Sequence, residues 1–183
     1  MRKGAQPDGI WEAVAMPSSD TRYYRRDAGN KLYRRSLYTF WKRSAPPASM
    51  EIFNAPSRET CSVRRERTNT PLQALVTMND IQFVEAARRL AENAMRAGER
   101  DFDRSLDFLG WRVLGREMND KEREIARAAY RDFLKFYDSN PKEARSLIET
   151  GDTDPEGSLP APELAAATML ANQLLNLDEA LTK

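Results

Sequence analysis

Apolar residues recur every three or four positions through most of residues 71–183, a spacing that places an apolar stripe along one face of a helix. Glycine, proline and capping residues divide this region into segments of helical length. The pattern predicts helices at about 71–78, 81–97, 101–114, 120–137, 141–150 and 162–176. No fixed repeat period relates these segments, so we expect an irregular bundle rather than a solenoid.

Two of the predicted helices begin with a specific capping signal. Thr70 precedes Pro71, and Gln73 follows at the third helical position. The Thr70 hydroxyl and the Gln73 amide can therefore each bond a backbone N–H that a helix start leaves free. Asn119 and Glu122 have the same spacing before the segment that begins at residue 120. These signals place two helix starts.

The first 70 residues have a different pattern, in which proline and glycine interrupt aromatic and basic residues. The spacing of apolar residues over 31–43 predicts an amphipathic helix. A strand is the alternative, because Tyr, Thr, Phe and Trp also suit sheets. Residues 45–65 predict an extended or looped segment. The whole sequence predicts an all-α fold: an irregular bundle of about six helices over 71–183, with a long, loop-rich, basic and aromatic arm over 1–70 that packs on it to form one domain.

The amino-acid types limit the chemistry of this chain. It contains no histidine, which excludes Ser-His and Cys-His nucleophile pairs, His-ligated zinc and a histidine haem ligand within it. Its single cysteine, Cys61, excludes an internal disulfide and a cysteine cluster. We therefore expect no complete catalytic site, no metal site and no cofactor within this chain. No apolar run approaches the roughly 20 residues of a membrane span, and no secretory signal follows Met1.

Charge is unevenly distributed along the chain. Residues 1–79 hold 14 Lys and Arg against 7 Asp and Glu, a net charge of +7, whereas residues 80–183 hold 15 against 21, a net charge of −6. The split indicates either that the two halves pack together or that the basic half meets an anionic partner.

Arg64, Arg65 and Arg67 lie directly before the predicted helix start at Pro71. Positive charge beside a helix N-terminus is unfavourable unless an anion or a carboxylate lies nearby. The arginines therefore predict either a site for phosphate, sulfate or carboxylate, or ion pairs with carboxylates of the same chain, and both alternatives stay open. The candidate anion- or partner-binding residues are Arg58, Arg64, Arg65, Arg67, Asn69, Trp41 and Arg43.

Aromatic residues interleaved with arginines over 32–43 are also typical of surfaces that bind single-stranded nucleic acid. An aromatic stripe at helical spacing more often faces a protein core. The net charge of the chain, +1, is also too small for a nucleic-acid-binding protein of the usual kind. We do not expect nucleic acid as a partner.

Six motifs lie in succession along the chain. They are QPDGIWE at 6–12, LYRRSLYTFWKR at 32–43, APSRE at 55–59, RRERTNTPLQAL at 64–75, NDIQFVEAAR at 79–88 and LNLDE at 175–179. Together they resemble the planctomycete-specific C-terminal domain of unknown function, found in large proteins that also carry cytochrome-type modules. One position departs from the family pattern, which usually has Asp where Asn54 follows Phe53. A carboxylate role there, such as metal binding, is not expected in this chain.

The resemblance implies that this chain is the C-terminal part of a longer, exported or periplasmic protein whose upstream domains would hold haem. It implies no assigned reaction. Our leading hypothesis is a module that docks on upstream domains of the same protein, with an anionic carbohydrate as a further candidate partner. The alternative is that Arg58, Arg64, Arg65 and Arg67 supply positive charge to a carbohydrate- or redox-related enzyme site completed by upstream domains.

Overall fold

The structure is a computed structural model, and it describes residues 17–18, 22, 25–42, 46–64, 66–99 and 101–182. The described residues form helices and loops and contain no β-strand, so the predicted all-α class is confirmed. The chain divides into two compact units, Met1–Thr68 and Asn69–Lys183, which are described separately below.

The first unit contains short helical turns joined by loops. Its elements are the 3₁₀ turns η1 (Gly29–Lys31) and η2 (Ser36–Tyr38) and the helix α2 (Ala48–Ile52). The predicted helix over 31–43 is therefore wrong. Arg35 (ψ 146°) and Thr39 (ψ 134°) are both extended, and they confine the helical turn to three residues. Aromatic and β-branched residues lose side-chain freedom in a helix, so this segment has little intrinsic tendency to continue the turn.

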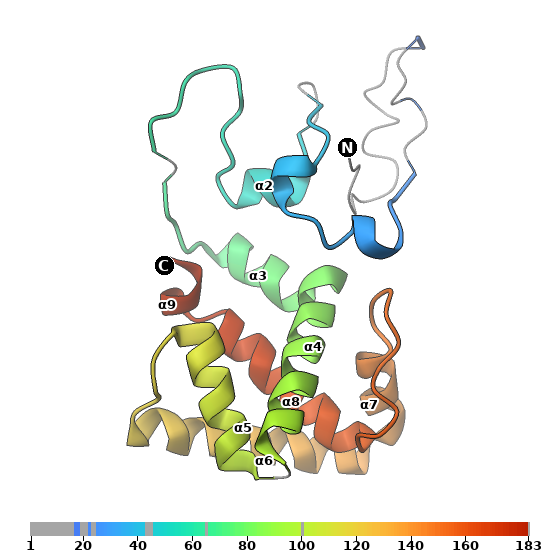
Figure 1. Cartoon of the computed structure of the whole chain (residues 1–183), viewed down its shortest axis with the longest axis vertical. Coiled ribbons are helices and arrows are strands. Elements are labelled where there is room, and N and C mark those ends of the chain that lie inside the picture. The colour runs from blue at the N-terminus through green and yellow to red at the C-terminus, as the bar shows by residue number, and fades with distance from the viewer. Residues whose placement is uncertain are drawn as a thin grey trace. The chain divides into compact units, whose positions relative to one another are not determined.

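The second unit is the helical bundle (Figure 1). Its elements are α3 (Pro71–Asn79), α4 (Ile81–Gly98), α5 (Phe102–Leu109), the π-helical turn η3 (Gly110–Leu114), α6 (Asp120–Ser139), α7 (Pro141–Ile148), α8 (Ala161–Leu175) and α9 (Asp178–Leu181). The six predicted helices are present with small shifts at their ends. The short helix α9 was not predicted.

Both predicted capping boxes form. The Thr70 hydroxyl accepts from the Gln73 N–H at 3.2 Å, and the Gln73 side chain accepts from the Thr70 N–H at 2.9 Å. Asn119 and Glu122 make the equivalent pair of bonds at 3.0 and 2.8 Å. Each box satisfies two donors that the first helical turn cannot bond internally, which is why these two boundaries match the sequence prediction.

Helix α8 is the centre of the bundle, because α4, α6 and α7 all pack against it (Figure 1). Ala165, Ala166 and Ala171 on α8 are fully buried, and their small side chains let neighbouring helices approach closely. Polar residues of α8 are buried too: the Asn172 side chain donates to the Thr77 carbonyl at 3.3 Å, which ties α3 to α8. None of the helices in the described ranges is long and apolar enough to cross a membrane.

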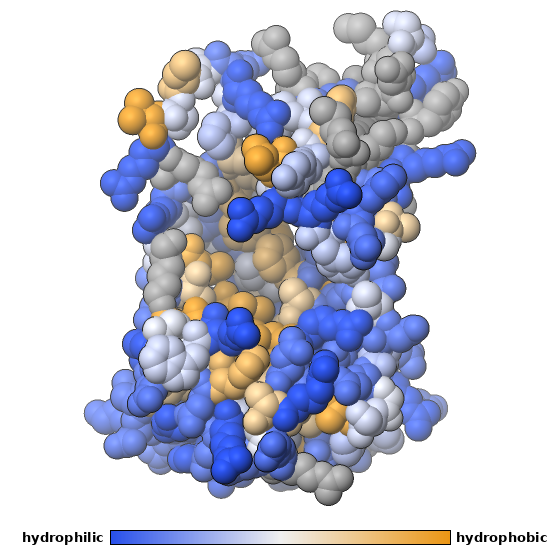
Figure 2. All heavy atoms as spheres, viewed as in Figure 1, coloured by the Kyte–Doolittle hydropathy of each residue, from blue (hydrophilic) through white to orange (hydrophobic). Residues whose placement is uncertain are grey.

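Helical spacing of the apolar residues predicts that Ile81 and Ile125 face inward, but both are exposed. Ile81 is 52% exposed and Ile125 is 69% exposed. On α6 the buried positions are Ala126 and Tyr137, and Ala129 and Phe133 pack partly buried against the core, so Ile125 lies outside the inward face. Figure 2 shows hydrophobic side chains at the surface of the helical unit, over the region where Figure 1 places α4, α5 and α8.

The acidic segment 152–160 is tied to α4 by a cluster of buried charges. The Arg88 guanidinium bonds the Glu92 carboxylate at 2.7 Å and donates to the Thr153 carbonyl at 2.6 Å, and neither of these two charged side chains is exposed. The Glu85 carboxylate accepts from the Thr153 N–H at 3.0 Å and from the Thr153 hydroxyl. Glu92 also accepts from the Glu156 N–H at 3.2 Å. This cluster fixes the path of the segment that leads into α8.

Candidate functional site

The predicted site residues lie in three different local environments where the structure describes them. Arg43 and Arg65 are outside the described residues. In the first unit, the Arg58 guanidinium carbon lies 5.0 Å from the centroid of the Trp41 ring, a cation–π contact. Asn69 belongs to the second unit, where its side chain donates to the Asp178 carboxylate at 3.1 Å.

Arg64 and Arg67 share an open hollow of about 410 Å³ with Glu66 and Thr68. Two guanidiniums beside one carboxylate leave a net positive charge among these lining residues. Anion binding at this hollow stays a prediction, because its occupant is not identified by the geometry.

Two larger cavities lie within the helical unit, and the sequence analysis did not anticipate either. The first, which we call the groove, has a volume of about 520 Å³ and lies among α6, α8, α9 and the segment 114–118. The second, which we call the pocket, has a volume of about 460 Å³ and lies among α4, α5, α6, α8 and the segment 158–160. Both volumes fall in the range of about 300–1,000 Å³ that is common for ligand sites.

The groove has an apolar floor and a charged rim. Met118, Ala126 and Leu174 form part of the floor and are buried, while Ile125 and Leu177 (43% exposed) stand at the surface. The rim carries Arg116, Glu122, Asp178 and Glu179, so three carboxylates lie against one guanidinium among the described lining residues. The groove is therefore both apolar and net negative.

Arg116 holds two elements of the groove together. Its guanidinium donates to both oxygens of Glu179 at 3.0 and 2.7 Å, and to both oxygens of Glu122 at 2.9 and 2.8 Å. Because a planar guanidinium matches two carboxylates in a fixed geometry, this clamp sets the position of α9 relative to the start of α6. The same bonds raise the pKa of Arg116 and keep its charge at every accessible pH.

We expect Glu122 to titrate far below an ordinary glutamate. The hydrogen bonds from Arg116, and then that from the Asn119 N–H, lower the pKa of Glu122 from 4.5 to about 2. A lowered folded-state pKa means that the bonds of ionised Glu122 stabilise the fold fully above pH 4.5, and that this contribution is lost as the pH falls toward 2. Carboxyl-carbon NMR of the full chain over this pH range measures the pKa directly.

Arg116→Gln is the control for this titration, since it keeps a hydrogen-bonding side chain but removes the charge. In that variant the pKa of Glu122 should rise toward 4.5. A wild-type Glu122 that already titrates near 4.5 would contradict the clamp.

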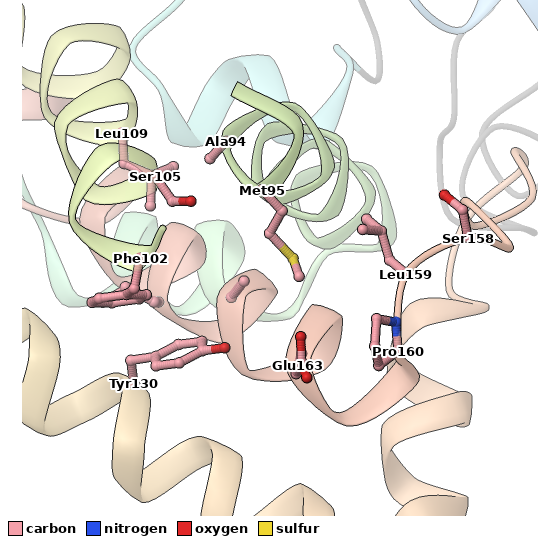
Figure 3. Close-up of a pocket in the computed structure, with 12 residues that line it drawn as sticks. Ala94, Met95, Phe102, Ser105, Leu109, Tyr130, Ser158, Leu159, Pro160 and Glu163 are labelled. Carbon is pink, nitrogen blue, oxygen red and sulfur yellow. The ribbon is translucent and has the colours of Figure 1, made fainter. Parts of the chain in front are cut away.

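The pocket is mostly apolar, with the Ser105 and Ser158 hydroxyls at its edges and the Tyr130 hydroxyl and Glu163 carboxylate on its lower side in Figure 3. Phe102 and Tyr130 stack with ring centroids 4.3 Å apart, and Met95 lies across the cavity from them. The Tyr130 hydroxyl points toward the Glu163 carboxylate (Figure 3). Burial, and then the nearby Glu163 and Asp138 charges, raises the pKa of Tyr130 to about 12, so its hydroxyl stays protonated at neutral pH.

A metal site needs several ligand side chains close together. In the part of the chain that the structure describes, no three Cys, Asp or Glu side chains gather closely enough to hold a metal ion. Cys61 is exposed.

The sequence contained only indirect signals of these two cavities. Ile125 interrupts the inward stripe of α6, and Phe102 and Tyr130 are the aromatic residues that their helices direct at the same cavity. The residues that line each cavity come from several helices, so no single stretch of sequence contains all of them.

Comparison with known proteins identifies one family. The family described as "Protein of unknown function (DUF1553)", PSD1, matches residues 4–130. No curated protein and no solved structure matches the chain.

Proposed function

This chain belongs to the DUF1553 family, and from that premise we propose that it is a non-catalytic docking module of a longer protein. The groove receives a basic amphipathic helix from a neighbouring domain of the same protein. The groove carries this proposal because it combines an apolar floor with a rim whose described charged residues are three carboxylates and one guanidinium.

The apolar floor accounts for the affinity. Ile125 is 69% exposed and Leu177 is 43% exposed, and both line the groove. Covering such side chains removes apolar surface from water, at about 25 cal/mol for each Å² buried. A helix that inserts apolar residues at one-turn spacing into a groove is a common way to bury such a floor.

The rim accounts for the choice of a basic partner. Two of the three carboxylates, Glu122 and Glu179, share the single guanidinium of Arg116, so these four charged lining residues have a net negative charge. Lys or Arg residues flanking the apolar face of a partner helix would complement this charge, while Asp or Glu would be repelled. The clamp also holds α9 in place before a partner arrives, which lowers the entropic cost of association.

The wider context of the proposal comes from the resemblance given above. It supports an exported or periplasmic parent protein with cytochrome-type upstream domains, which would contain any haem. The hollow lined by Arg64 and Arg67 suits an anionic group, such as a carbohydrate carrying sulfate or carboxylate, and belongs to the same proposal. No observation favours the alternative hypothesis, in which Arg58, Arg64, Arg65 and Arg67 supply positive charge to an enzyme site that upstream domains complete.

Two designed amphipathic peptides test the groove. Both are helices with the same leucine face, and they differ only in carrying lysine or glutamate on the other face. NMR titration of the full chain should show the lysine peptide shifting the signals of Ile125 and Leu177, and binding at least tenfold more tightly than the glutamate peptide. Equal affinity for the two peptides, or shifts away from the groove, would remove the proposal.

A matched pair of variants locates the contact. Ile125→Gln should weaken binding of the lysine peptide by about tenfold, since truncating an apolar anchor at an interface commonly costs 1–2 kcal/mol. Phe136→Gln is the control, because Phe136 is also exposed on α6 but lies outside the groove. Thermal unfolding should be nearly unchanged in both variants, as each side chain is mostly in solvent.

A further inference from the structure

The pocket is a separate cavity from the groove, and its polar groups have an unusual arrangement. Its described lining residues include one carboxylate, Glu163, and one phenol, Tyr130, but no lysine or arginine. Among the described residues no hydrogen bond or ion pair engages either the Glu163 carboxylate or the Tyr130 hydroxyl. Both groups are thus available to a molecule that enters the pocket.

Two arginines that lie close to the pocket in sequence are paired with carboxylates outside its lining. Arg96 bonds the Glu156 carboxylate at 3.0 Å, and Arg127 bonds the Asp103 carboxylate at 2.7 Å. Because no lysine or arginine is among the described lining residues, the wall of the pocket itself does not balance the charge of Glu163. A cation bound there would meet a favourable field, and an anion would be repelled.

The remaining walls are suited to a flat or aliphatic body. Phe102 and Tyr130 offer stacked aromatic rings, and Met95 and Leu159 face them from α4 and from the segment before α8. Aromatic rings also attract a cation over their faces, and a methionine thioether adapts to differently shaped apolar groups. The pocket therefore joins one anionic position to an apolar chamber of about 460 Å³.

The wall formed by Ser158, Leu159 and Pro160 is held in place from the other side. The segment just before it is bonded to α4 by the buried cluster of Arg88 and Glu92 described above, through the Thr153 carbonyl and the Glu156 N–H. A wall fixed in this way keeps the cavity formed in the absence of a ligand. Preformed cavities of this kind are typical of small-molecule sites.

We infer that the pocket binds a small organic amine: a protonated amino group that pairs with Glu163 and bonds Tyr130, attached to an apolar or aromatic body that fills the chamber between Phe102 and Met95. The ammonium donates to the Glu163 carboxylate and to the Tyr130 oxygen. The Tyr130 hydroxyl donates in turn to Glu163 or to a polar atom of the ligand. This activity is independent of docking at the groove.

Three compounds of similar size and different charge test the inference. Phenylbutylamine is cationic, phenylbutanol has the same number of heavy atoms and is neutral, and phenylbutyrate is anionic. NMR titration of the full chain should show the amine shifting the signals of Met95 and Leu159, with the alcohol binding about tenfold more weakly, since hydrogen bonds between charged groups are stronger than those of a neutral hydroxyl. Phenylbutyrate should bind most weakly.

Variants distinguish a binding role of Glu163 from a structural one. Glu163 is also in the first turn of α8, where a carboxylate favours the helix dipole. Glu163→Gln should abolish the preference for the amine over the alcohol, whereas a purely structural role would change only the unfolding temperature. Tyr130→Phe should weaken amine binding by about fivefold and leave the alcohol less affected.

Glu124→Gln is the matched control, because Glu124 is an exposed carboxylate on α6 outside the pocket. It should leave both affinities unchanged. Equal affinity of the wild type for the amine and the alcohol, an unchanged preference in Glu163→Gln, or the absence of shifts at the pocket would each overturn the inference.

Discussion

Replacing Arg88 with methionine is expected to lower the free energy of unfolding by about 3–5 kcal/mol, which is a large part of the stability of a domain of this size. The Arg88 and Glu92 side chains have no exposed surface, and Glu85 is nearly as buried. Removing the guanidinium leaves two carboxylates in a site from which water is excluded. Urea unfolding of the full chain, followed by circular dichroism, measures the loss.

The carboxylates of this cluster also accept hydrogen bonds from the loop, which increases the stability lost when Arg88 is replaced. Glu85 accepts from the Asp152 and Thr153 N–H groups at 3.2 and 3.0 Å, and Glu92 accepts from the Glu156 N–H at 3.2 Å. If either carboxyl group turns away or takes up a proton, these loop donors lose an acceptor or its charge. We therefore expect that replacing the whole cluster with apolar residues would not restore wild-type stability.

Arg96→Met is the matched control for Arg88→Met. Arg96 lies two turns further along the same helix and pairs with Glu156 at 3.0 Å, but its side chain is 55% exposed. An exposed ion pair contributes about 0–1 kcal/mol, so this variant should be nearly as stable as the wild type. If the two variants lose similar amounts of stability, the buried cluster is not a main support of the fold.

Replacing Gly151 with alanine is expected to cost about 2–4 kcal/mol, from backbone strain and overpacking together. Gly151 has a φ of +113°, which residues with a Cβ rarely adopt. A Cβ at this position would also lie 2.6 Å from the carboxyl carbon of Glu85. The added methyl therefore meets a side chain that the loop N–H groups already hold in place. Urea unfolding again gives the change.

Gly157→Ala in the same segment is the control for Gly151→Ala. No atom lies within 4 Å of a Cβ built at Gly157. Alanine there should be neutral, or should stabilise the fold by about 0.4–1 kcal/mol through its effect on the unfolded chain. Equal effects at the two glycines would show that neither the positive φ nor the contact with Glu85 limits stability.

The best sequence predictions concern interactions between residues close together in the chain. The boxes at Thr70–Gln73 and Asn119–Glu122 join residues three positions apart, so their side chains and backbone meet as soon as the helix starts. Periodicity of the apolar residues likewise located all six larger helices of the bundle. The same method was wrong over 31–43, where the only helical turn beyond Lys31 among the described residues is the three-residue turn Ser36–Tyr38.

The burial of the charged cluster on α4 could not be predicted from local sequence spacing. Glu85, Arg88 and Glu92 are three and four residues apart, the spacing of an ordinary solvated helix face. Only the packing of residues 151–156 against α4 buries them, and that segment lies more than sixty positions away in the sequence. The sequence contains the charges but not the information that water is excluded from them.

By itself the sequence determined the helical class and most helix boundaries, because each depends on neighbours within a few residues. Tertiary structure alone decided that Ile125 faces a groove, that Tyr130 and Glu163 meet at one pocket, and that Asn69 bonds Asp178. These arrangements join side chains from helices far apart in the chain. They follow from how the helices pack around α8, since packing sets which faces are buried and which cavities remain between them.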